Sequence, residues 1–324
     1  MKKIVSLLLC FALIFSLCLA LCSCNEPAPT EEPPAPDPNA ANYDSAVALL
    51  NSGDYAGAKA LFESLGDYKD SKEHLSRFYY MPNRYTFDLI GKQGESVLTF
   101  NDKNLPLRDT VSINGSQNYS EFEYNANGDI LKQSAVKEGN LYTYDFTYND
   151  KGLMATAVYA AYDGNTATHL YTYTDEGLIE SEIYSVNGVV DYDYTNTYDE
   201  NGNLICREYT TGGVRYVLNI TYTYDANGRT IKEEGIYDNG IKEIYEYEYD
   251  DAGNVLKRTF TDGEDYVTYN EYTYDSHGNS IKEVYTDENG VKQTIEMEYV
   301  LVYIPTGITN GTEFFFYTYW AYNI

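Results

Sequence analysis

Two kinds of side chain alternate over most of the region from about Phe100 to Tyr299. In the segment before Gly228, one face is mainly aromatic and aliphatic, with Tyr216, Leu218, Ile220, Tyr222 and Tyr224. The other face carries Val217, Asn219, Thr221 and Thr223. A period of two in a segment rich in Tyr, Thr, Ile and Val predicts a β-strand with one buried face.

The predicted strands are separated by a recurring turn, seen clearly in YEYDDAGNVL (247–256). Asp or Asn at its first position accepts a hydrogen bond from a nearby backbone N–H, and glycine at its fourth position tolerates a left-handed backbone. These glycines recur at steps of 24 to 26 residues: Gly128, Gly152, Gly177, Gly202, Gly228, Gly253 and Gly278. Self-similarity at a fixed period predicts a repeat architecture in which the glycines are structural turns.

A second set of glycines lies midway between these turns: Asn114-Gly115, Glu138-Gly139, Asp163-Gly164, Asn187-Gly188, Gly212-Gly213, Asn239-Gly240, Asp262-Gly263 and Asn289-Gly290. Such pairs between alternating segments indicate hairpins, so each repeat is predicted to be two antiparallel strands in a meander of roughly sixteen. Open sheets rarely exceed about ten strands without curling. We therefore expect a mainly β protein with a curled or barrel-like sheet and an aromatic inner face.

Tyr-Asp pairs open several of the turns: Tyr198-Asp199, Tyr224-Asp225, Tyr249-Asp250 and Tyr274-Asp275. In these pairs the chain resembles the YD-repeat (Rhs-type) family over about two thirds of its length. The resemblance implies a coiled sheet, which in the largest members of that family forms a hollow shell around a toxin. The chain departs from those members because it has no arginine-rich repeat core.

The N-terminal sequence has the features of an export signal. Met1-Lys2-Lys3 is positively charged, an apolar segment follows to Leu21, and Leu21-Cys22-Ser23-Cys24 resembles the bacterial lipobox. We expect a signal peptide over residues 1–23 and lipidation of Cys24. The alternative is an uncleaved transmembrane anchor. Both place the rest of the chain outside the cytoplasmic membrane, on the bacterial cell surface if it is lipidated.

Two short segments precede the repeats. Residues 24–42 are rich in proline and are expected to form an extended linker. Residues 43–82 have apolar positions at helical spacing and resemble a tetratricopeptide repeat around Gly53-Asp54-Tyr55, Ala58 and Phe62. A third helix is expected from Asp70-Ser71 to Phe78, ended by Pro82. This segment is interpreted either as a cap on the first β-repeat or as a docking element.

The repeat domain is assigned to residues 83–304, and residues 305–324 hold the aromatic segment EFFFYTYWAYNI with Trp320. An aromatic closing strand is expected to cap the terminal edge of the sheet. The alternative is a platform on which a glycan stacks.

Composition and charge limit the classes of partner and of functional site that the chain can have. The net charge is −28, so nucleic acid and anionic lipid surfaces are excluded as partners, and neutral or cationic ligands are favoured. His74, His169 and His277 lack metal-ligand spacing, and no motif for a cofactor or nucleophile is present, so no metal, cofactor or catalytic residue is predicted. The acid pairs Asp250-Asp251 and Glu246-Glu248 could be drawn as a glycosidase pair, but acids are abundant. Cys206 is expected to be a small buried hydrophobe.

We therefore expect a lipid-anchored, non-catalytic binding or adhesion module for a glycan or protein. Tyrosine suits this function because its ring stacks and its hydroxyl orients a ligand. The candidate ligand contacts are Trp320, Tyr222, Tyr224, Tyr247, Tyr249, Tyr272 and Tyr274. A structural or assembly protein of the cell envelope, including a fragment of an Rhs-like shell, is the first alternative, and a glycan-active enzyme is a distant third.

Overall fold

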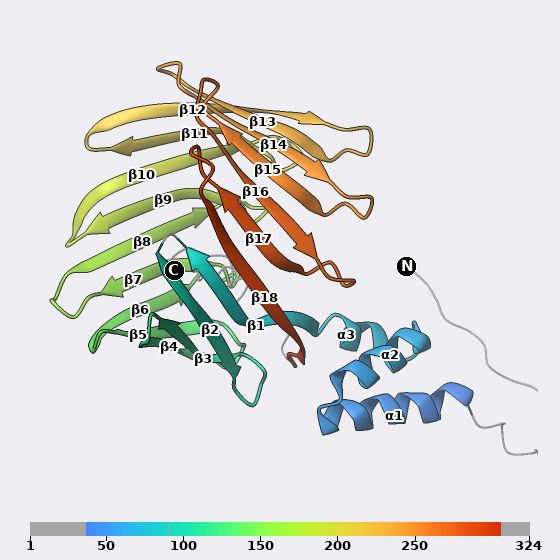
Figure 1. The fold of residues 1–324 in the computed structure, drawn as a ribbon. Coiled ribbons are helices and arrows are strands. Elements are labelled where there is room, and N and C mark those ends of the chain that lie inside the picture. Colours follow the sequence, from blue (N-terminus) through green and yellow to red (C-terminus); the bar gives the residue numbers. More distant parts are fainter. Residues whose placement is uncertain (1–36, 90, 306–324) are drawn as a thin grey trace, which may run out of the picture.

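A computed structural model describes residues 37–89 and 91–305, and within these ranges three helices precede 18 strands (Figure 1). The helices are α1 (Pro38–Ser52), α2 (Tyr55–Leu65) and α3 (Ser71–Leu75). The strands are β1 (Phe78–Leu89), β2 (Lys92–Phe100), β3 (Pro106–Ile113), β4 (Ser116–Tyr124), β5 (Ile130–Lys137), β6 (Asn140–Tyr148), β7 (Met154–Ala160), β8 (Thr166–Tyr173), β9 (Ile179–Val186), β10 (Val189–Tyr198), β11 (Leu204–Thr211), β12 (Val214–Tyr224), β13 (Thr230–Tyr237), β14 (Lys242–Tyr249), β15 (Val255–Thr261), β16 (Val267–Tyr274), β17 (Ser280–Thr286) and β18 (Lys292–Tyr303).

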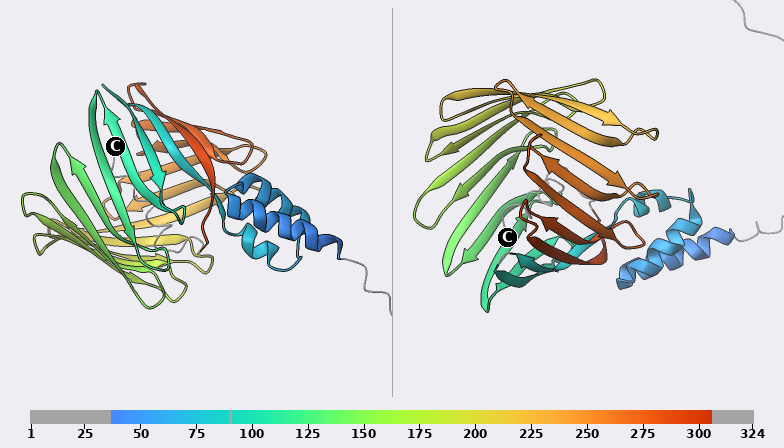
Figure 2. Two further views of the ribbon diagram at one scale, coloured as in Figure 1. Left: turned by 90° about the horizontal axis from the view of Figure 1, so that it is seen from below. Right: turned by 45° about the horizontal axis from the view of Figure 1, so that its top comes forward.

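The sheet closes on itself. Each strand pairs antiparallel with the next, and β1 pairs with both β2 and β18, from Phe78 opposite Tyr303 to Asp88 opposite Thr294. The result is an up-and-down barrel, which confirms the predicted mainly β meander with a small N-terminal helical segment (Figures 1 and 2). The described part of the chain has 18 strands rather than roughly sixteen, because residues 78–100 contribute two further strands.

The end of the helical segment differs from the prediction. Helix α3 stops at Leu75, and Phe78 already belongs to β1, so Pro82 lies inside a strand instead of ending a helix. Proline is tolerated there because the pairing of β1 with β18 shifts register between Pro82 and Arg84, and the pairing with β2 starts only at Arg84. Pairing with β18 therefore overrides the local helical pattern.

The first helix begins earlier than residue 43. Asp37 caps α1 by accepting a hydrogen bond from the backbone N–H of Asn39 at 2.9 Å, and Pro38 occupies the first helical position. Proline is favoured there because the missing N–H has no partner in the helix and the fixed φ is already helical. The last residues of the segment expected as a linker are consequently part of α1.

The turns between repeats are held by their first residue. In the turn after β12, Asp225 Oδ1 accepts from the backbone N–H groups of Asn227 (2.8 Å) and Arg229 (2.9 Å), and Gly228 has a φ of +80°. The φ of the seven repeat glycines lies between +76° and +94°. We call the end of the barrel that carries these turns the Asp rim, and the opposite end the hairpin rim.

Pairing register places most tyrosines on one face. Tyr247 on β14 lies opposite Arg258 on β15, whereas Glu246 and Glu248 face the other way with Lys257. On strand after strand the tyrosine face is buried or half-buried and the opposite face is exposed. Side chains on the concave side of a closed sheet converge, so the tyrosine face is the inner wall of the barrel.

Tyrosines at the Asp rim fasten neighbouring strands. The hydroxyl of Tyr249 donates to the carbonyl oxygen of Thr230 on β13 at 2.6 Å, at the open end of the β13–β14 hairpin. The same bond is made by Tyr148, Tyr173, Tyr198, Tyr274 and Tyr299 to the preceding strand. In the earliest copy, the buried hydroxyl of Tyr124 has no hydrogen-bond partner. The last tyrosine of most repeats is thus a structural clasp.

The outer wall is polar and carries ion pairs between adjacent strands. Arg84 Nη2 lies 2.7 Å from Glu95, and Lys282 Nζ lies 2.8 Å from Glu296. Further pairs join Arg108 to Glu121 and Lys132 to Asp145. Such a surface is suited to contact with water.

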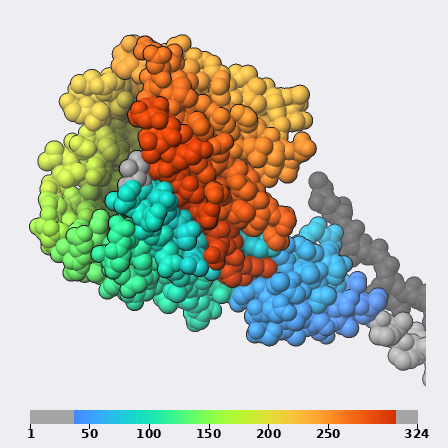
Figure 3. All heavy atoms as spheres, in the orientation of Figure 1, coloured from blue at the N-terminus to red at the C-terminus, as the bar shows by residue number. Residues whose placement is uncertain are grey.

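The helices pack against the barrel at the Asp rim, where they form a separate lobe (Figure 3). Phe62 of α2 is fully buried and packs with Phe78 and Tyr303 at the ends of β1 and β18. Asn104, in the turn after β2, donates to the hydroxyl of Tyr55 at 2.8 Å. This packing is compatible with the predicted cap.

Several predictions fall outside the described residues: the signal peptide 1–23, Cys24 with most of the linker, and the aromatic closing segment with Trp320. The capping role of that segment assumed an open sheet edge, whereas the edge of β18 is occupied by β1. Among the residues that the structure describes, no helix is both long and apolar enough to cross a membrane.

We predict that Gly228→Ala destabilises the fold by about 1 kcal/mol, because alanine disfavours the left-handed backbone. A Cβ at Gly228 meets nothing within 4 Å, so crowding contributes nothing. Gly228→Asn is the matched control and should cost less, since Asn tolerates positive φ. Urea unfolding monitored by circular dichroism measures both, and equal losses would contradict the backbone explanation.

Candidate functional site

The inner wall is the candidate site because it brings polar groups together among the tyrosine rings. Two clusters stand out, one around Glu182 on β9 and one around Arg258 on β15, and a pocket lies at the Asp rim. Within residues 37–89 and 91–305, no group of three His, Cys, Asp or Glu side chains could hold a metal ion.

The Glu182 cluster is a closed hydrogen-bond network. Glu182 is 7 % exposed, and its Oε1 lies 2.6 Å from His169 Nδ1 and 3.0 Å from the hydroxyl of Tyr192. Burial alone would raise the pKa of Glu182, but hydrogen bonds from His169, Tyr194 and Tyr192 outweigh it and lower the pKa. The Glu182 carboxylate is therefore ionised, and its oxygen atoms accept hydrogen bonds from side chains of the inner wall.

The network continues to β11 through Arg207. Its guanidinium carbon lies 4.6 Å from the ring centroid of Tyr194, and its Nε donates to Asn196 Oδ1 at 2.9 Å. Asn196 in turn donates to the carbonyl oxygen of Ile179 at 2.9 Å. Each polar group in this part of the wall has a partner, so the cluster's first role is structural.

The Arg258 cluster is more open. The guanidinium carbon of Arg258 lies 4.3 Å from the ring centroid of Tyr245, and Tyr247 hydrogen-bonds to Glu233. Burial raises the pKa of Glu233, and the nearby Arg258 and the bond from Tyr247 offset only part of that rise. A cation, a carboxyl group and tyrosine hydroxyls thus share one stretch of wall from β13 to β15.

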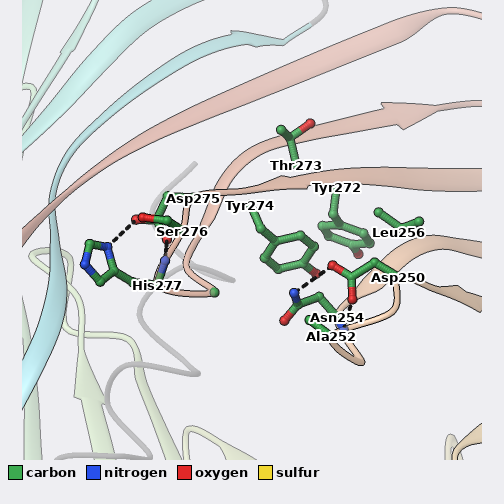
Figure 4. Close-up of a pocket in the computed structure, with 11 residues that line it drawn as sticks. Asp250, Ala252, Asn254, Leu256, Tyr272, Thr273, Tyr274, Asp275, Ser276 and His277 are labelled. Carbon is green, nitrogen blue, oxygen red and sulfur yellow. Dashed lines mark hydrogen bonds and ion pairs between the residues drawn. The ribbon is translucent and has the colours of Figure 1, made fainter.

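A pocket of about 770 Å³ lies at the Asp rim between two successive repeat turns. Tyr272 and Tyr274 point to one side of β16 and Thr273 to the other, and Asp250 holds Asn254 within its own turn (Figure 4). The lining residues are Asp250, Ala252, Asn254, Leu256, Tyr272, Thr273, Tyr274, Asp275, Ser276, His277 and Gly278.

Tyr272 connects the rim pocket with the Arg258 cluster. Burial and the carboxyl group of Glu283 raise its pKa to about 12, while Arg258 acts in the opposite direction. A tyrosine hydroxyl is protonated at neutral pH even at its ordinary pKa of 10, so the hydroxyl of Tyr272 can donate to a ligand, and its raised pKa extends this to more alkaline solutions. From the rim inward, Tyr274, Tyr272 and Arg258 form a continuous surface of rings and polar groups.

The six described candidate tyrosines fall into three groups. The hydroxyls of Tyr222, Tyr249 and Tyr274 donate hydrogen bonds to backbone carbonyl oxygens of the preceding strand. Tyr247 and Tyr272 lie one inward position deeper, at the Arg258 cluster. Tyr224, at the end of its strand, is 44 % exposed and stacks on Tyr222.

Other residues considered from the sequence lie elsewhere. Glu246 and Glu248 face outward, and Asp250 holds a turn. Cys206 is only partly buried and lies on the outer wall opposite Asn219. Among the histidines, His74 bonds to Tyr303, His169 belongs to the Glu182 cluster, and His277 is half-exposed and lies against the Tyr80 ring.

Sequence reasoning missed Glu182, Glu233 and Arg258. All three are charged residues at positions where the period of two predicts the buried face. That departure from the pattern is the signal that could have identified them.

We predict that Glu182→Gln lowers stability at pH 7 and has a much smaller effect at pH 3. Because the pKa of folded Glu182 is below its ordinary value of 4.5, ionised Glu182 stabilises the fold above about pH 4.5. That contribution is lost as the pH falls through the folded-state pKa. Urea midpoints at the two pH values measure it, and Glu208→Gln in the exposed pair with Arg215 is the control with little effect at either.

No protein-family model and no curated protein matches the chain. Among solved structures, a porin-like protein from Bacteroides uniformis is similar at 13 % identity and a TM-score of 0.38, covering 68 % of this chain and 98 % of that one. A porin-like protein from Bacteroides vulgatus has 10 % identity and a TM-score of 0.30, covering 68 % and 99 %. The TcdB2-TccC3 structure without its hypervariable C-terminal region has 14 % identity and a TM-score of 0.35, covering 65 % of this chain and only 12 % of that one. These likenesses assign no ligand.

Proposed function

We propose that this protein is a non-catalytic binding module that holds a neutral glycan chain against the inner wall between β13 and β17. The observation that carries the proposal is the continuous surface from the rim pocket through Tyr272 and Tyr247 to Arg258. It combines flat rings, tyrosine hydroxyls, a guanidinium group and carboxyl groups.

The chemistry of this wall matches a sugar. A sugar ring has apolar C–H faces and hydroxyl groups that donate and accept, whereas tyrosine offers an apolar ring with a polar tip. Arg258 supplies donors only, and Glu233 and Glu283 supply acceptors. A site lined by aromatic rings with a few placed polar groups is the usual form of a small-molecule site.

Charge selects among glycans. The whole chain carries −28, and the inner wall near the pocket has the carboxyl groups of Glu233, Glu243 and Glu283. The cations described there are Arg258 and, at the rim, Arg229, which is already paired with Asp225 and donates to the carbonyl oxygen of Asp250. An acidic polysaccharide would be repelled over most of the approach. Neutral sugars avoid this cost, and amino sugars with a positive charge would gain from it.

The proposed setting is the outside of the cytoplasmic membrane, with lipid on Cys24 and the proline-rich residues after it as a tether. The helices at the Asp rim then lie on the tethered side of the barrel. A protein ligand for the same wall and a structural role in the cell envelope are the competing proposals, and the binding test below distinguishes a glycan ligand from both.

The environment of Glu233 is one specific observation in favour of the enzyme alternative. A carboxyl group with a raised pKa in an aromatic site is the form that a glycosidase uses as its general acid. Hydrolysis of a glycan that is abolished by Glu233→Gln would replace the binding proposal with this one.

We predict that a neutral oligosaccharide binds and that Tyr272→Ala weakens binding about tenfold or more, since an aromatic contact at a buried site is worth about 1.4 kcal/mol. A glycan array identifies the ligand, and isothermal titration calorimetry measures the variants. Tyr269→Ala is the matched control, because Tyr269 lies on the outward face of the same strand.

Binding that Tyr269→Ala weakens as much as Tyr272→Ala would place the ligand elsewhere. If no glycan binds at all, the glycan proposal is wrong, and the protein ligand and the envelope-assembly role are the proposals that remain. Circular dichroism of both variants establishes that the fold is intact.

A further inference from the structure

We propose that residues 306–324 of this chain fold back into the barrel and lie against the inner wall of β1 to β5, which we call the β1–β5 wall. Two observations point to this placement. The inward side chains of the β1–β5 wall are buried although they face the barrel interior, and β18 brings the chain to the edge of the same wall.

The β1–β5 wall is buried more deeply than the wall proposed to bind a glycan. Leu98 is 6 % exposed, and Ser96, Ser120 and Gln133 are 5 %, 5 % and 8 % exposed. Strand register places all four on the inward face. From β14 to β17, the inward residues Tyr245, Arg258, Asn270 and Glu283 are only half-buried. Deep burial is therefore a property of one side of the interior.

A closed sheet of 18 strands does not fill its interior with its own side chains. At about 4.8 Å per strand its girth is about 86 Å and its width about 27 Å, whereas facing sheets fill the space between them at about 10 Å. The two hydrophobic clusters on the β1–β5 wall, as far as the structure describes them, contain no residue from β7 to β17. Another part of the chain is needed to cover this wall.

The end of β18 brings the chain to the mouth of the barrel beside the β1–β5 wall. Ile304 is fully buried and packs in one cluster with Phe100 and Tyr124, at the Asp-rim ends of β2 and β4. The backbone N–H of Ile304 donates to the carbonyl oxygen of Arg77 at 2.9 Å, which holds the chain there. The sequence from Ile304 to Gly307 has proline second and glycine fourth, a pattern that favours a β-turn and a reversal of direction.

Residues 306–324 have the length and the chemistry to cover this wall. Fully extended, they span up to about 60 Å, twice the length of a strand such as β2. Seven of the residues from 314 to 322 are aromatic, and Glu313 is the only charged residue in the segment. The central inward residues of β1 to β4 are also uncharged, except for Asp109. The segment therefore enters an acidic protein at little electrostatic cost.

Tethering favours this segment over a free ligand or a second copy. Attached at the mouth of the barrel, it has an effective concentration of about millimolar, whereas a second copy carrying −28 is repelled. The segment cannot extend the sheet, because β1 already occupies the edge of β18. The wall from β13 to β17 stays accessible, so this inference does not depend on the glycan proposal.

The first test uses the fluorescence of Trp320, the only tryptophan, in residues 25–324, which retain every described helix and strand. Its emission should be blue-shifted, and its quenching by acrylamide several-fold weaker than in the urea-unfolded chain. The matched control is a Trp320→Tyr, Tyr269→Trp double variant, whose single tryptophan lies on the outer wall and should be quenched readily. Equal quenching of the two folded proteins would overturn the proposal.

The second test locates the contact by hydroxyl-radical footprinting read by mass spectrometry. Residues 25–324 are compared with a chain that stops after Pro305, and circular dichroism establishes that both are folded. Without the segment, oxidation of Phe87 and Phe122 on the β1–β5 wall should rise several-fold, whereas oxidation of the outward Tyr269 should not change. Unchanged oxidation of both phenylalanines would contradict the contact.

A further variant and a measurement of mass complete the test. If the shortened chain does not fold, Phe315→Asp combined with Trp320→Asp in residues 25–324 should give the same footprint. Sedimentation velocity at the footprinting concentration should show a monomer. A dimer whose dissociation exposes Phe122 would assign the cover to the segment of a second copy and overturn the proposal. Loss of glycan binding in Tyr272→Ala bears only on the opposite wall, so the two proposals fail separately.

Discussion

The pairing of β1 with β18 is the contact on which the rest of the structure depends. It joins residues near the start of the barrel to residues near its end, with Phe78 opposite Tyr303 and Asp88 opposite Thr294. Without it the sheet would have two unpaired edges, each a template for association with other chains. With it, every described strand has two neighbours, and the inward side chains of all the strands belong to one continuous wall. The aromatic wall and the polar outer wall both follow from that closure.

Much of the fold could be predicted from the sequence because its signals are local. The alternation around Tyr247, the turn opened by Asp250 and the glycine at Gly253 each lie within a few residues. Closure has no such signal, since the ladder between β1 and β18 joins segments far apart in the chain and includes Pro82. The same long-range pairing explains why α3 ends at Leu75, whereas the local apolar pattern predicts a helix as far as Phe78.

The site could be predicted only in part, for a related reason. Tyrosines such as Tyr272 were recognisable because they recur with the repeat. Arg258 and Glu233 could not be recognised from the sequence, because the chain has 50 acidic residues and many basic ones. Only the strand register shows that these two side chains lie on the inner wall.

In the repeats that end β14 and β16, the two tyrosines near the turn have different roles. The last one, such as Tyr249 or Tyr274, clasps the preceding strand, and its hydroxyl is no longer available to a ligand. The one two residues earlier, Tyr247 or Tyr272, lies deeper on the wall, beside carboxyl groups and Arg258. Equivalent positions in successive repeats lie two strands apart, about 10 Å. In earlier repeats the same position holds Phe122, Phe146 or Asn196, and Tyr222 donates to the preceding strand, so the backbone repeats more regularly than the chemistry of its inner wall. The wall from β13 to β17 differs from the rest of the barrel because Tyr247 and Tyr272 occupy this position in two successive repeats, next to carboxyl groups and Arg258.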